Sequence, residues 1–321
     1  MTTATFFIPV QERIRQVEAR MRAESNGHHP DLGAALDHLL ASGGKRVRPA
    51  VALLTGGMLD ADPDRLITLA AAIELLHTAT LVHDDLIDGA LLRRGIPTLN
   101  SQWTPAATVL TGDFIFARAA KLAAETDSVE VMRLFSETLS TIVNGEITQM
   151  FSNRIVPDRE DYFQRIYSKT ASMFELATSA AAVLSPEVDE AMEGVRAYGY
   201  EIGMAFQVID DVLDFTGEQD TVGKPVANDL RQGLITLPTI IYMDSHPNDP
   251  DVEFLQSGNH YDEARLARLT TAIRQSQAIP EAVAEARQFV DRGLDALADL
   301  PRTPERQALE ELANYIVRRH R

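Results

Sequence analysis

Two acidic clusters of the same form are the residues of this sequence most suited to chemistry. Each has the pattern Asp-Asp-x-x-Asp, at residues 84–88 and 210–214. Residues four positions apart share one face of a helix, so the outer carboxylates of each cluster point the same way. Carboxylates this close repel one another by about 1 kcal/mol per pair in water, and by more in a drier cleft. A solvated helix end tolerates that repulsion, whereas a bound divalent cation removes it.

The positions of the clusters favour the cation. Each follows an apolar run, at residues 69–82 and 202–209, that indicates a buried helix. Three neighbouring carboxylates without a bound cation are disfavoured at the end of a buried helix. Mg²⁺ takes oxygen ligands and commonly shares one or two carboxylates with substrate phosphates. We therefore expect both clusters to bind Mg²⁺, through Asp84, Asp85, Asp88, Asp210, Asp211 and Asp214.

Composition and charge exclude several classes of function. The 321 residues are 45% hydrophobic and 24% charged, as in a globular protein. The net charge of −17 argues against binding of nucleic acid or of an anionic membrane. The absence of cysteine excludes disulfides, thiolate catalysis and zinc–thiolate sites. No signal peptide is apparent, and Glu74 and His77 interrupt the longest apolar stretch, so we expect a cytoplasmic protein without stable membrane insertion.

Basic residues gather in three glycine-containing loops of this acidic chain, at residues 43–49, 93–97 and 223–231. The second and third loops each begin within ten residues of an acidic cluster. Loops and helix starts expose N–H donors, and arginine grips phosphate with a fork of donors. We therefore expect these loops to bind a diphosphate through five side chains: Lys45, Arg48, Arg93, Arg94 and Lys224.

Other polar residues lie in apolar company on the expected helices. They are Lys169, Thr170 and Gln207, and the last shares a face with Asp210, three residues further on. His77 lies two turns before the first acidic cluster, which favours a substrate contact. A rival hypothesis uses the same histidine: Glu74-x-x-His77 is half of the ligand set of a helical di-iron protein. No second copy of that motif is found, and iron analysis would decide between the two.

Helical periodicity dominates the sequence, and alternating strand patterns are almost absent. Capping residues followed by proline and an acid mark several helix starts, as at residues 62–64 and 303–305. No linker divides the chain, so we expect one all-α domain over residues 1–321. Helices are predicted at residues 9–25, 31–41, 46–58, 64–88, 105–125, 128–150, 158–183, 187–215, 234–244, 261–275, 280–297 and 304–319.

In order and spacing, these motifs resemble the trans-isoprenyl diphosphate synthases, or polyprenyl synthetases. The resemblance runs from about Gly43 to Val317. It is carried by Gly-Gly-Lys-Arg-Val-Arg-Pro at 43–49, the stretch from His77 through Gly95, Gly145-Glu146, Lys169-Thr170, the stretch from Phe206 through Asp214, Gly223-Lys224-Pro225 and Thr236-Leu237-Pro238.

The resemblance implies an all-α fold around a central elongated apolar cavity, with the two acidic clusters facing each other across its mouth, and a homodimer. It implies that Asp84, Asp88 and Asp210 bind Mg²⁺, with the other three carboxylates as nearby ligands or support. The implied contacts to the allylic diphosphate are Arg93, Lys169, Thr170, Gln207 and Lys224, and those to isopentenyl diphosphate are Lys45, Arg48, His77 and Arg94. The implied catalytic set is Asp84, Asp85, Asp88, Lys169, Gln207, Asp210 and Lys224.

Two departures from the family pattern stand close together. Leu234 takes the place of a lysine that many relatives have near the allylic diphosphate, and Ala227 takes the place of a glycine, so that loop is expected to close differently. Long-chain relatives often also lack this lysine, so the loss does not predict an inactive protein.

The implied reaction joins isopentenyl diphosphate to an allylic diphosphate, farnesyl or geranylgeranyl diphosphate, head to tail. The growing tail is expected to run back along the helix before the first acidic cluster. Ala79 and Thr80, one turn back, are small and do not stop the tail. The next side chains that could stop it are Leu76 and Ile73. One isoprene unit spans about one 5.4 Å turn. We therefore predict a medium-to-long product, nearest to hexa- to octaprenyl diphosphate.

Besides the di-iron protein, four alternatives remain at this point. The chain could be a geranylgeranyl or farnesyl diphosphate synthase, or a catalytic subunit that needs a small partner. A noncatalytic partner subunit commonly loses an acidic motif, whereas both are intact here. A class I terpene cyclase usually carries an Asn/Ser/Glu second metal motif, against which residues 210–214 argue.

Overall fold

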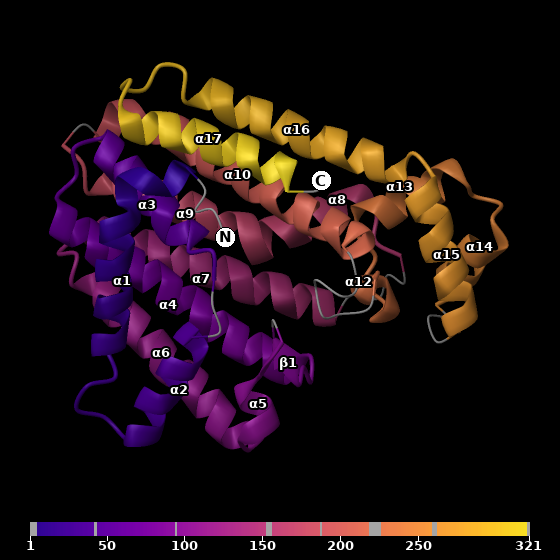
Figure 1. Cartoon of the computed structure of the whole chain (residues 1–321), viewed down its shortest axis with the longest axis horizontal. Coiled ribbons are helices and arrows are strands. Elements are labelled where there is room, and N and C mark those ends of the chain that lie inside the picture. Colours follow the sequence, from indigo (N-terminus) through magenta and orange to yellow (C-terminus); the bar gives the residue numbers. More distant parts are fainter. Residues whose placement is uncertain are drawn as a thin grey trace. The chain divides into compact units, whose positions relative to one another are not determined.

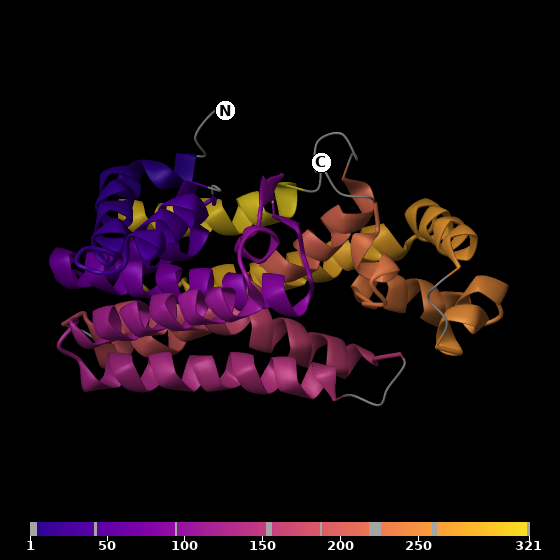
Figure 2. The same ribbon diagram turned by 90° about the horizontal axis from the view of Figure 1, so that it is seen from below.

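The structure is a computed structural model that describes residues 5–41, 44–93, 95–151, 156–186, 188–217, 226–258 and 262–319. It is all-α, as the periodicity predicts. In the described part of the chain the only strands are β1 (Leu92–Arg93) and β2 (Ile96–Pro97). They form an antiparallel pair with Arg93 opposite Ile96. Figure 2 shows the same helical ribbons from below.

Each of the twelve predicted helices is found, with ends shifted by three residues or fewer except where noted below (Figure 1). The elements are η1 (Thr5–Val10), α1 (Gln11–Ala23), α2 (Pro30–Ala41), α3 (Val47–Met58), α4 (Pro63–Ile87), α5 (Leu99–Gln102), α6 (Pro105–Ala124), α7 (Val129–Met150), α8 (Arg159–Ile166), η2 (Tyr167–Ala171), α9 (Ser172–Val183), α10 (Val188–Thr216), α12 (Asn228–Arg231), α13 (Leu237–Ser245), α14 (Pro250–Gln256), α15 (Glu263–Gln275), α16 (Ala278–Ala296) and α17 (Pro304–Arg318). The sequence did not predict η1, α5, α12 or α14, and the helix predicted at 158–183 is divided into α8, η2 and α9.

The chain divides into two compact units, each assembled from separate segments. Unit 1 comprises Met1–Thr138, Met173–Gly199 and Leu297–Glu311, and unit 2 comprises Leu139–Ser172, Tyr200–Ala296 and Leu312–Arg321. The expectation of a single domain stays a prediction. The first acidic cluster belongs to unit 1 and the second to unit 2, so each is described within its own unit.

Unit 1 is built on α4, which packs against α1, α3 and α6. The helix starts where the sequence predicts: the Asp62 side chain accepts a hydrogen bond from the backbone N–H of Arg65, and Pro63 is the first helical residue. Gly56 of α3 lets the two helices approach, because a Cβ there would lie 2.2 Å from a methyl of Leu66. This packing buries α4 on nearly all sides.

By length and composition, α4 could cross a membrane, contrary to the expectation drawn from Glu74 and His77. In the protein, however, 67% of the most apolar 18-residue stretch of α4 is buried. Glu74 is buried as well, and its Oε1 lies 2.8 Å from Nη1 of Arg46. A buried carboxylate paired with a buried guanidinium is a feature of a protein core. We therefore describe α4 as the core helix of unit 1.

Unit 2 contains the second half of α10 and the helices α8 and α12–α16. The helix α13 packs against α8, α15 and α16, and α14 packs against α15. A capping box begins α8: the Asp158 side chain accepts from the backbone N–H of Asp161, whose side chain accepts from that of Asp158. These contacts fix α8, and with it the turn η2 that follows directly.

Candidate active site

The first acidic cluster ends α4, and its middle carboxylate is held by an arginine. Asp85 is 5% exposed, and its Oδ1 accepts hydrogen bonds from Nε (2.9 Å) and Nη2 (2.8 Å) of Arg93 on β1. Gly89 has a positive φ of 62°, which ends the helix and lets the N–H of Ala90 return to the carbonyl of Asp85. Asp88, at the helix end, is exposed. Asp85 therefore positions the hairpin that carries Arg93.

In the basic segment at residues 44–48, which leads into α3, one cation has a structural role and two are candidates for binding substrate. Arg46 has a positive φ of 47°, and its guanidinium pairs with Glu18 at 2.9 Å and with Glu74 at 2.8 Å. Lys45 is exposed, and the half-buried Arg48 lies over the ring of Phe174 at 5.1 Å. The loop thus keeps Lys45 and Arg48 as the candidates for an anionic substrate, while Arg46 anchors it.

The pairing of Glu74 also bears on the di-iron rival. Its carboxylate is engaged by Arg46, and the sequence offers no second Glu-x-x-His motif. His77 is half-buried one turn further along α4, and its carbonyl accepts from the hydroxyl of Thr80 at 2.8 Å. The ion pair of Glu74 with Arg46 argues against an iron site at this helix.

The second acidic cluster ends α10, and its middle carboxylate is also buried. Asp211 is 3% exposed; its Oδ2 accepts from the hydroxyl of Tyr162 at 2.8 Å and its Oδ1 from Nε2 of Gln207 at 2.7 Å. Oε1 of Gln207 in turn accepts from the hydroxyl of Thr170 at 2.7 Å. The structure therefore joins two predicted substrate contacts, Thr170 and Gln207, to the second cluster by consecutive hydrogen bonds.

Burial is the main cause of the pKa shifts of Asp211 and Tyr162. Desolvation, with the charge of Asp229 nearby, raises the pKa of Asp211 to about 7, although the hydrogen bonds from Gln207 and Tyr162 lower it. Burial and the charge of Asp211 raise the pKa of Tyr162 well above its usual range. The tyrosine hydroxyl therefore stays protonated and donates.

Asp214, the last carboxylate of the second cluster, holds the residues at the start of α12. Its two oxygens accept from the backbone N–H groups of Asn228 and Asp229, each at 3.1 Å. Its carbonyl accepts from the N–H of Ala227 at 2.8 Å. Ala227 is fully buried and adopts the left-handed conformation, with φ 54° and ψ 47°. Ala227 thus takes up a backbone conformation that favours glycine.

Ala227→Gly is expected to leave the free energy of unfolding within about 0.5 kcal/mol of that of the unsubstituted chain. Release from the left-handed region gains roughly 1–2 kcal/mol, whereas the greater freedom of glycine in the unfolded chain and the lost burial of the methyl group cost about as much. Urea unfolding of both proteins measures the difference. The matched control is Ala267→Gly, at an exposed position inside α15, where the same change should lower stability by about 1 kcal/mol. Equal losses at both positions would contradict the strain assigned to Ala227.

Asp210, the first carboxylate of the second cluster, pairs with a cation that sequence reasoning missed. Nη2 of Arg319 lies 3.1 Å from its Oδ1, and the arginine side chain is 7% exposed. The guanidinium also lies over the ring of Phe206 at 4.3 Å. The family resemblance ends at Val317, and the basic run at residues 318–319 is the only signal in the sequence. Arg319 neutralises part of the charge of this cluster.

Lys169 and Thr170 lie on η2, a π-helical turn, which is a rare element that is frequent at functional sites. Two glycines allow close packing around it. A Cβ on Gly145 of α7 would lie 2.5 Å from the Cβ of Ser168, and one on Gly203 of α10 would lie 2.5 Å from the Cα of Ala171. Nζ of Lys169 pairs with Oε1 of Glu146, next to the first glycine, at 2.8 Å. In the Gly145-Glu146 motif, the glycine therefore allows η2 to pack closely against α7, and the glutamate orients Lys169.

The residues predicted to set product length all lie on α4. Ala79, Leu76 and Ile73 are buried, and Thr80 is half-buried. The apolar cavity expected along this helix, and the facing of the two clusters across its mouth, stay predictions. Two predicted substrate contacts, Arg94 and Lys224, lie outside the described residues.

Within the described residues, no three acidic or histidine side chains are placed to hold a metal ion by themselves. The hydrogen bonds above give a physical reason. The carboxylates of Asp85 and Asp211 are turned toward side-chain donors, and that of Asp214 is turned toward backbone N–H groups. Because Mg²⁺ usually takes only one or two carboxylates and completes its shell with phosphate and water, a three-residue cluster is not required.

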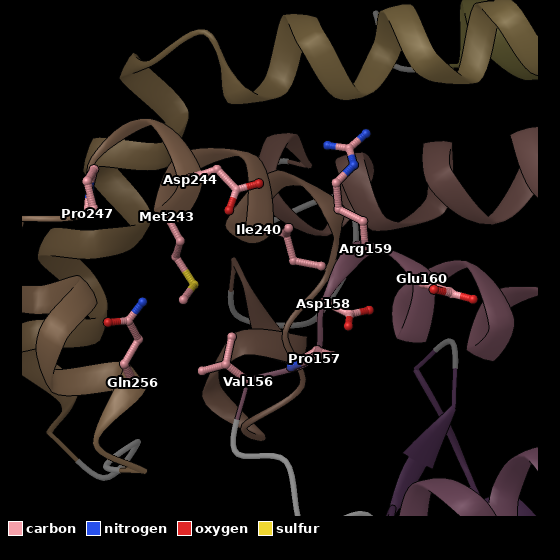
Figure 3. Close-up of a pocket in the computed structure, with 10 residues that line it drawn as sticks. All are labelled: Val156, Pro157, Asp158, Arg159, Glu160, Ile240, Met243, Asp244, Pro247 and Gln256. Atoms are coloured by element: carbon pink, nitrogen blue, oxygen red, sulfur yellow. The ribbon is translucent and has the colours of Figure 1, made fainter.

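A cavity of about 670 Å³ lies at the start of α8, against α13 and α14 (Figure 3). Its apolar lining includes Val156, Ile240 and Met243, and Asp244 and Gln256 lie beside them. The residues that line it are separate from those that the sequence predicts to bind substrate. This cavity is therefore not the expected substrate site.

The comparisons with known proteins agree with these motifs. The polyprenyl synthetase family matches residues 29–273. The chain is 37% identical to a prenyl transferase of Synechocystis sp., with 99% of both chains covered, and 36% identical to the octaprenyl diphosphate synthase of Escherichia coli, with 88% of each covered. The crystal structure of a polyprenyl synthase from Caulobacter crescentus, complexed with calcium and isoprenyl diphosphate, matches with a TM-score of 0.92 and 34% identity over 100% of this chain and 98% of that one. The chain therefore belongs to the polyprenyl synthetase family of prenyltransferases.

Proposed function

We propose that this chain joins isopentenyl diphosphate to an allylic diphosphate, head to tail, and repeats the step to give a medium-to-long all-trans polyprenyl diphosphate. The observation that carries the proposal is the hydrogen-bonded series from Thr170 through Gln207 to Asp211. It connects residues predicted to contact the allylic substrate with an acidic cluster predicted to bind metal. Such a connection is needed if one site is to hold both the diphosphate and its metal.

The donor set of the clusters fits a hard divalent cation, because all of its ligating atoms are oxygens. Asp84, Asp88 and Asp210 would hold Mg²⁺, with Asp85, Asp211 and Asp214 in support. When bound, Mg²⁺ neutralises the charge that develops on a departing diphosphate. The calcium in the Caulobacter crescentus relative is likewise a hard cation that takes oxygen ligands.

The side chains of this chain would bind and orient the two substrates. Lys169, held by Glu146 at 2.8 Å, and Arg93, held by Asp85, each present a fixed positive charge for the allylic diphosphate. Lys45, Arg48 and His77 would bind isopentenyl diphosphate. The C–O bond of the allylic diphosphate would break to give an allylic cation and diphosphate, and the double bond of isopentenyl diphosphate would then attack the cation. A proton is then lost to the departing diphosphate, and holding the two substrates together supplies much of the acceleration.

The proposed product is long because Ala79 and Thr80, one turn before the first acidic cluster on α4, are too small to stop the growing tail. The octaprenyl diphosphate synthase of Escherichia coli is a long-chain relative, which supports this proposal. The alternative is a product of geranylgeranyl or farnesyl length, in which the tail is stopped closer to the first cluster. Leu76 and Ile73 are the side chains that would stop the tail in the long-chain case.

We also propose a homodimer. Four exposed apolar side chains follow one face of α7 and the residue after it: Val143, Ile147, Met150 and Phe151, which are 48–77% exposed. Their spacing of four, three and one residues places them on a single stripe. A second copy of the chain would cover this stripe, and a small partner subunit is the alternative. Light scattering of the purified chain alone distinguishes these two cases.

The test of the proposed function is incubation of the purified protein with Mg²⁺, radiolabelled isopentenyl diphosphate and farnesyl diphosphate, followed by sizing of the dephosphorylated products. The expected result is label in products of hexa- to octaprenyl length, and none after chelation of the metal. Label confined to geranylgeranyl length would support the short-chain alternative. No incorporation by a chain that light scattering shows to be a homodimer, with geranyl, farnesyl or geranylgeranyl diphosphate as primer, would refute the proposal.

A further inference from the structure

Both oxygens of Asp211 are held by side chains from separate elements of unit 2. Gln207, one turn earlier on α10, donates to Oδ1 at 2.7 Å, and Tyr162 of α8 donates to Oδ2 at 2.8 Å. The first donor is itself fixed by Thr170 of η2. Asp211 is thus tied directly to α8 and, through Gln207, to η2, while Asp210 beside it and Asp214 one turn on are half-buried.

Tyr162 is the member of this network that no motif identifies. It is fully buried, and its ring meets that of Phe163 edge to face at 5.3 Å. The guanidinium of Arg165 lies 5.5 Å from the ring centroid, and its Nη2 donates to the carbonyl of Ile235 at 2.7 Å. Because packing fixes the ring on its sides, the hydroxyl has one position, and Asp211 must come to it.

We infer that Tyr162 is a positioning residue for Asp210, the carboxylate of the second cluster proposed to bind metal. Its hydroxyl holds Asp211, and Asp211 holds the end of α10 in the orientation that presents Asp210. This inference rests on the proposed function in one respect, namely that the second cluster binds a divalent cation. Removing a hydrogen bond behind a metal ligand typically costs 10–100-fold in metal affinity or activity.

The chain offers a matched control for the loss of one buried hydroxyl. Tyr198, on the same helix α10, is also fully buried, and its hydroxyl donates a single hydrogen bond, to the carbonyl of Leu309 at 2.7 Å. It belongs to unit 1, whereas the second acidic cluster belongs to unit 2. Tyr198→Phe therefore removes the same atom from a comparable environment, without altering the support of Asp211.

The test compares Tyr162→Phe, Tyr198→Phe and the unsubstituted full-length chain. Mn²⁺ is titrated into each protein, and the free ion is measured by electron paramagnetic resonance. The Mg²⁺ dependence of isopentenyl diphosphate incorporation and the Tm are measured on the same preparations. We expect Tyr162→Phe to raise the half-saturating Mn²⁺ concentration by about tenfold or more. Tyr198→Phe should stay within twofold of the unsubstituted chain, although both changes lower the Tm by comparable amounts.

An unchanged Mn²⁺ affinity in Tyr162→Phe would overturn the inference, and so would an equal weakening in Tyr198→Phe, because general loosening would then explain both. If Tyr162→Phe does not fold, Gln207→Leu removes the other donor to Asp211 and should weaken Mn²⁺ binding similarly. The proposed function fails separately: an unsubstituted homodimer that incorporates no isopentenyl diphosphate refutes the reaction, while the Mn²⁺ titration still decides the role of Tyr162.

Discussion

Asp84→Asn is expected to slow prenyl transfer by about three orders of magnitude. The change removes the charge of a proposed metal ligand and leaves the size of the side chain almost unchanged. Groups that stabilise charge at a reacting centre are each worth on the order of 10²–10³-fold in rate, and a ligand that holds a metal supports all of the charge neutralisation the metal supplies. A single-turnover assay of label transfer from isopentenyl diphosphate at saturating Mg²⁺ measures the effect.

The control for this variant lies on the same helix. Asp64→Asn changes an exposed carboxylate in the first turn of α4. It should leave the rate within twofold and alter stability by less than about 1 kcal/mol through the helix dipole. Asp84→Asn should retain the circular dichroism spectrum of the unsubstituted chain. A rate within tenfold of the unsubstituted protein would exclude Asp84 as a metal ligand in the reaction.

Ala79→Phe is expected to shorten the main product from hexa- to octaprenyl length to geranylgeranyl or farnesyl length. Ala79 is 2% exposed and lies just over one turn before the first acidic cluster. Because each isoprene unit spans about one turn of 5.4 Å, a large ring at this position would stop the tail after the first additions. Ala79→Leu should give intermediate lengths. Chromatography of dephosphorylated, radiolabelled products gives the length distribution directly.

A buried phenylalanine also strains the packing of α4, by about 1–3 kcal/mol. The product distribution is a ratio, so a smaller folded fraction lowers total label without changing the lengths. Ala70→Leu is the control, because Ala70 is equally buried on α4 but points about 180° away around the helix. Unchanged product lengths with Ala79→Phe would refute the role of Ala79, and shortening with Ala70→Leu would show that the length limit does not depend on the face that carries Ala79.

The sequence predicts the fold well because long amphipathic and buried helices carry strong periodic signals. The start of α4 at Pro63 is an example, since its capping aspartate, proline and apolar run agree. The short helices α5, α12 and α14 span four to seven residues, which is too few for a period to appear. The pair β1–β2 has two residues in each strand, so it gives no alternating pattern.

The site is predicted in its residue types but not in its partnerships. The sequence identifies Asp85 and Arg93 separately, as metal ligand and substrate contact, and only the fold places them 2.8 Å apart. Tyr162 stands in a stretch that has the character of a core helix, and its role depends on a contact 49 residues away. The pairing of Arg319 with Asp210 depends on the path of α17, which no local pattern encodes.

The π-helical turn at Tyr167–Ala171 limits which insertions and deletions this chain can accept. A π turn holds one more residue than the α-helical turn it replaces. Deleting one residue of this turn would therefore leave an α-helical turn and keep α8 and α9 in register, whereas deleting one residue of α8 would turn Tyr162 by about 100° relative to Thr170 and separate their hydrogen bonds to Asp211 and Gln207. We therefore expect an active relative that is one residue shorter between these two positions to lack the π turn rather than a residue of α8.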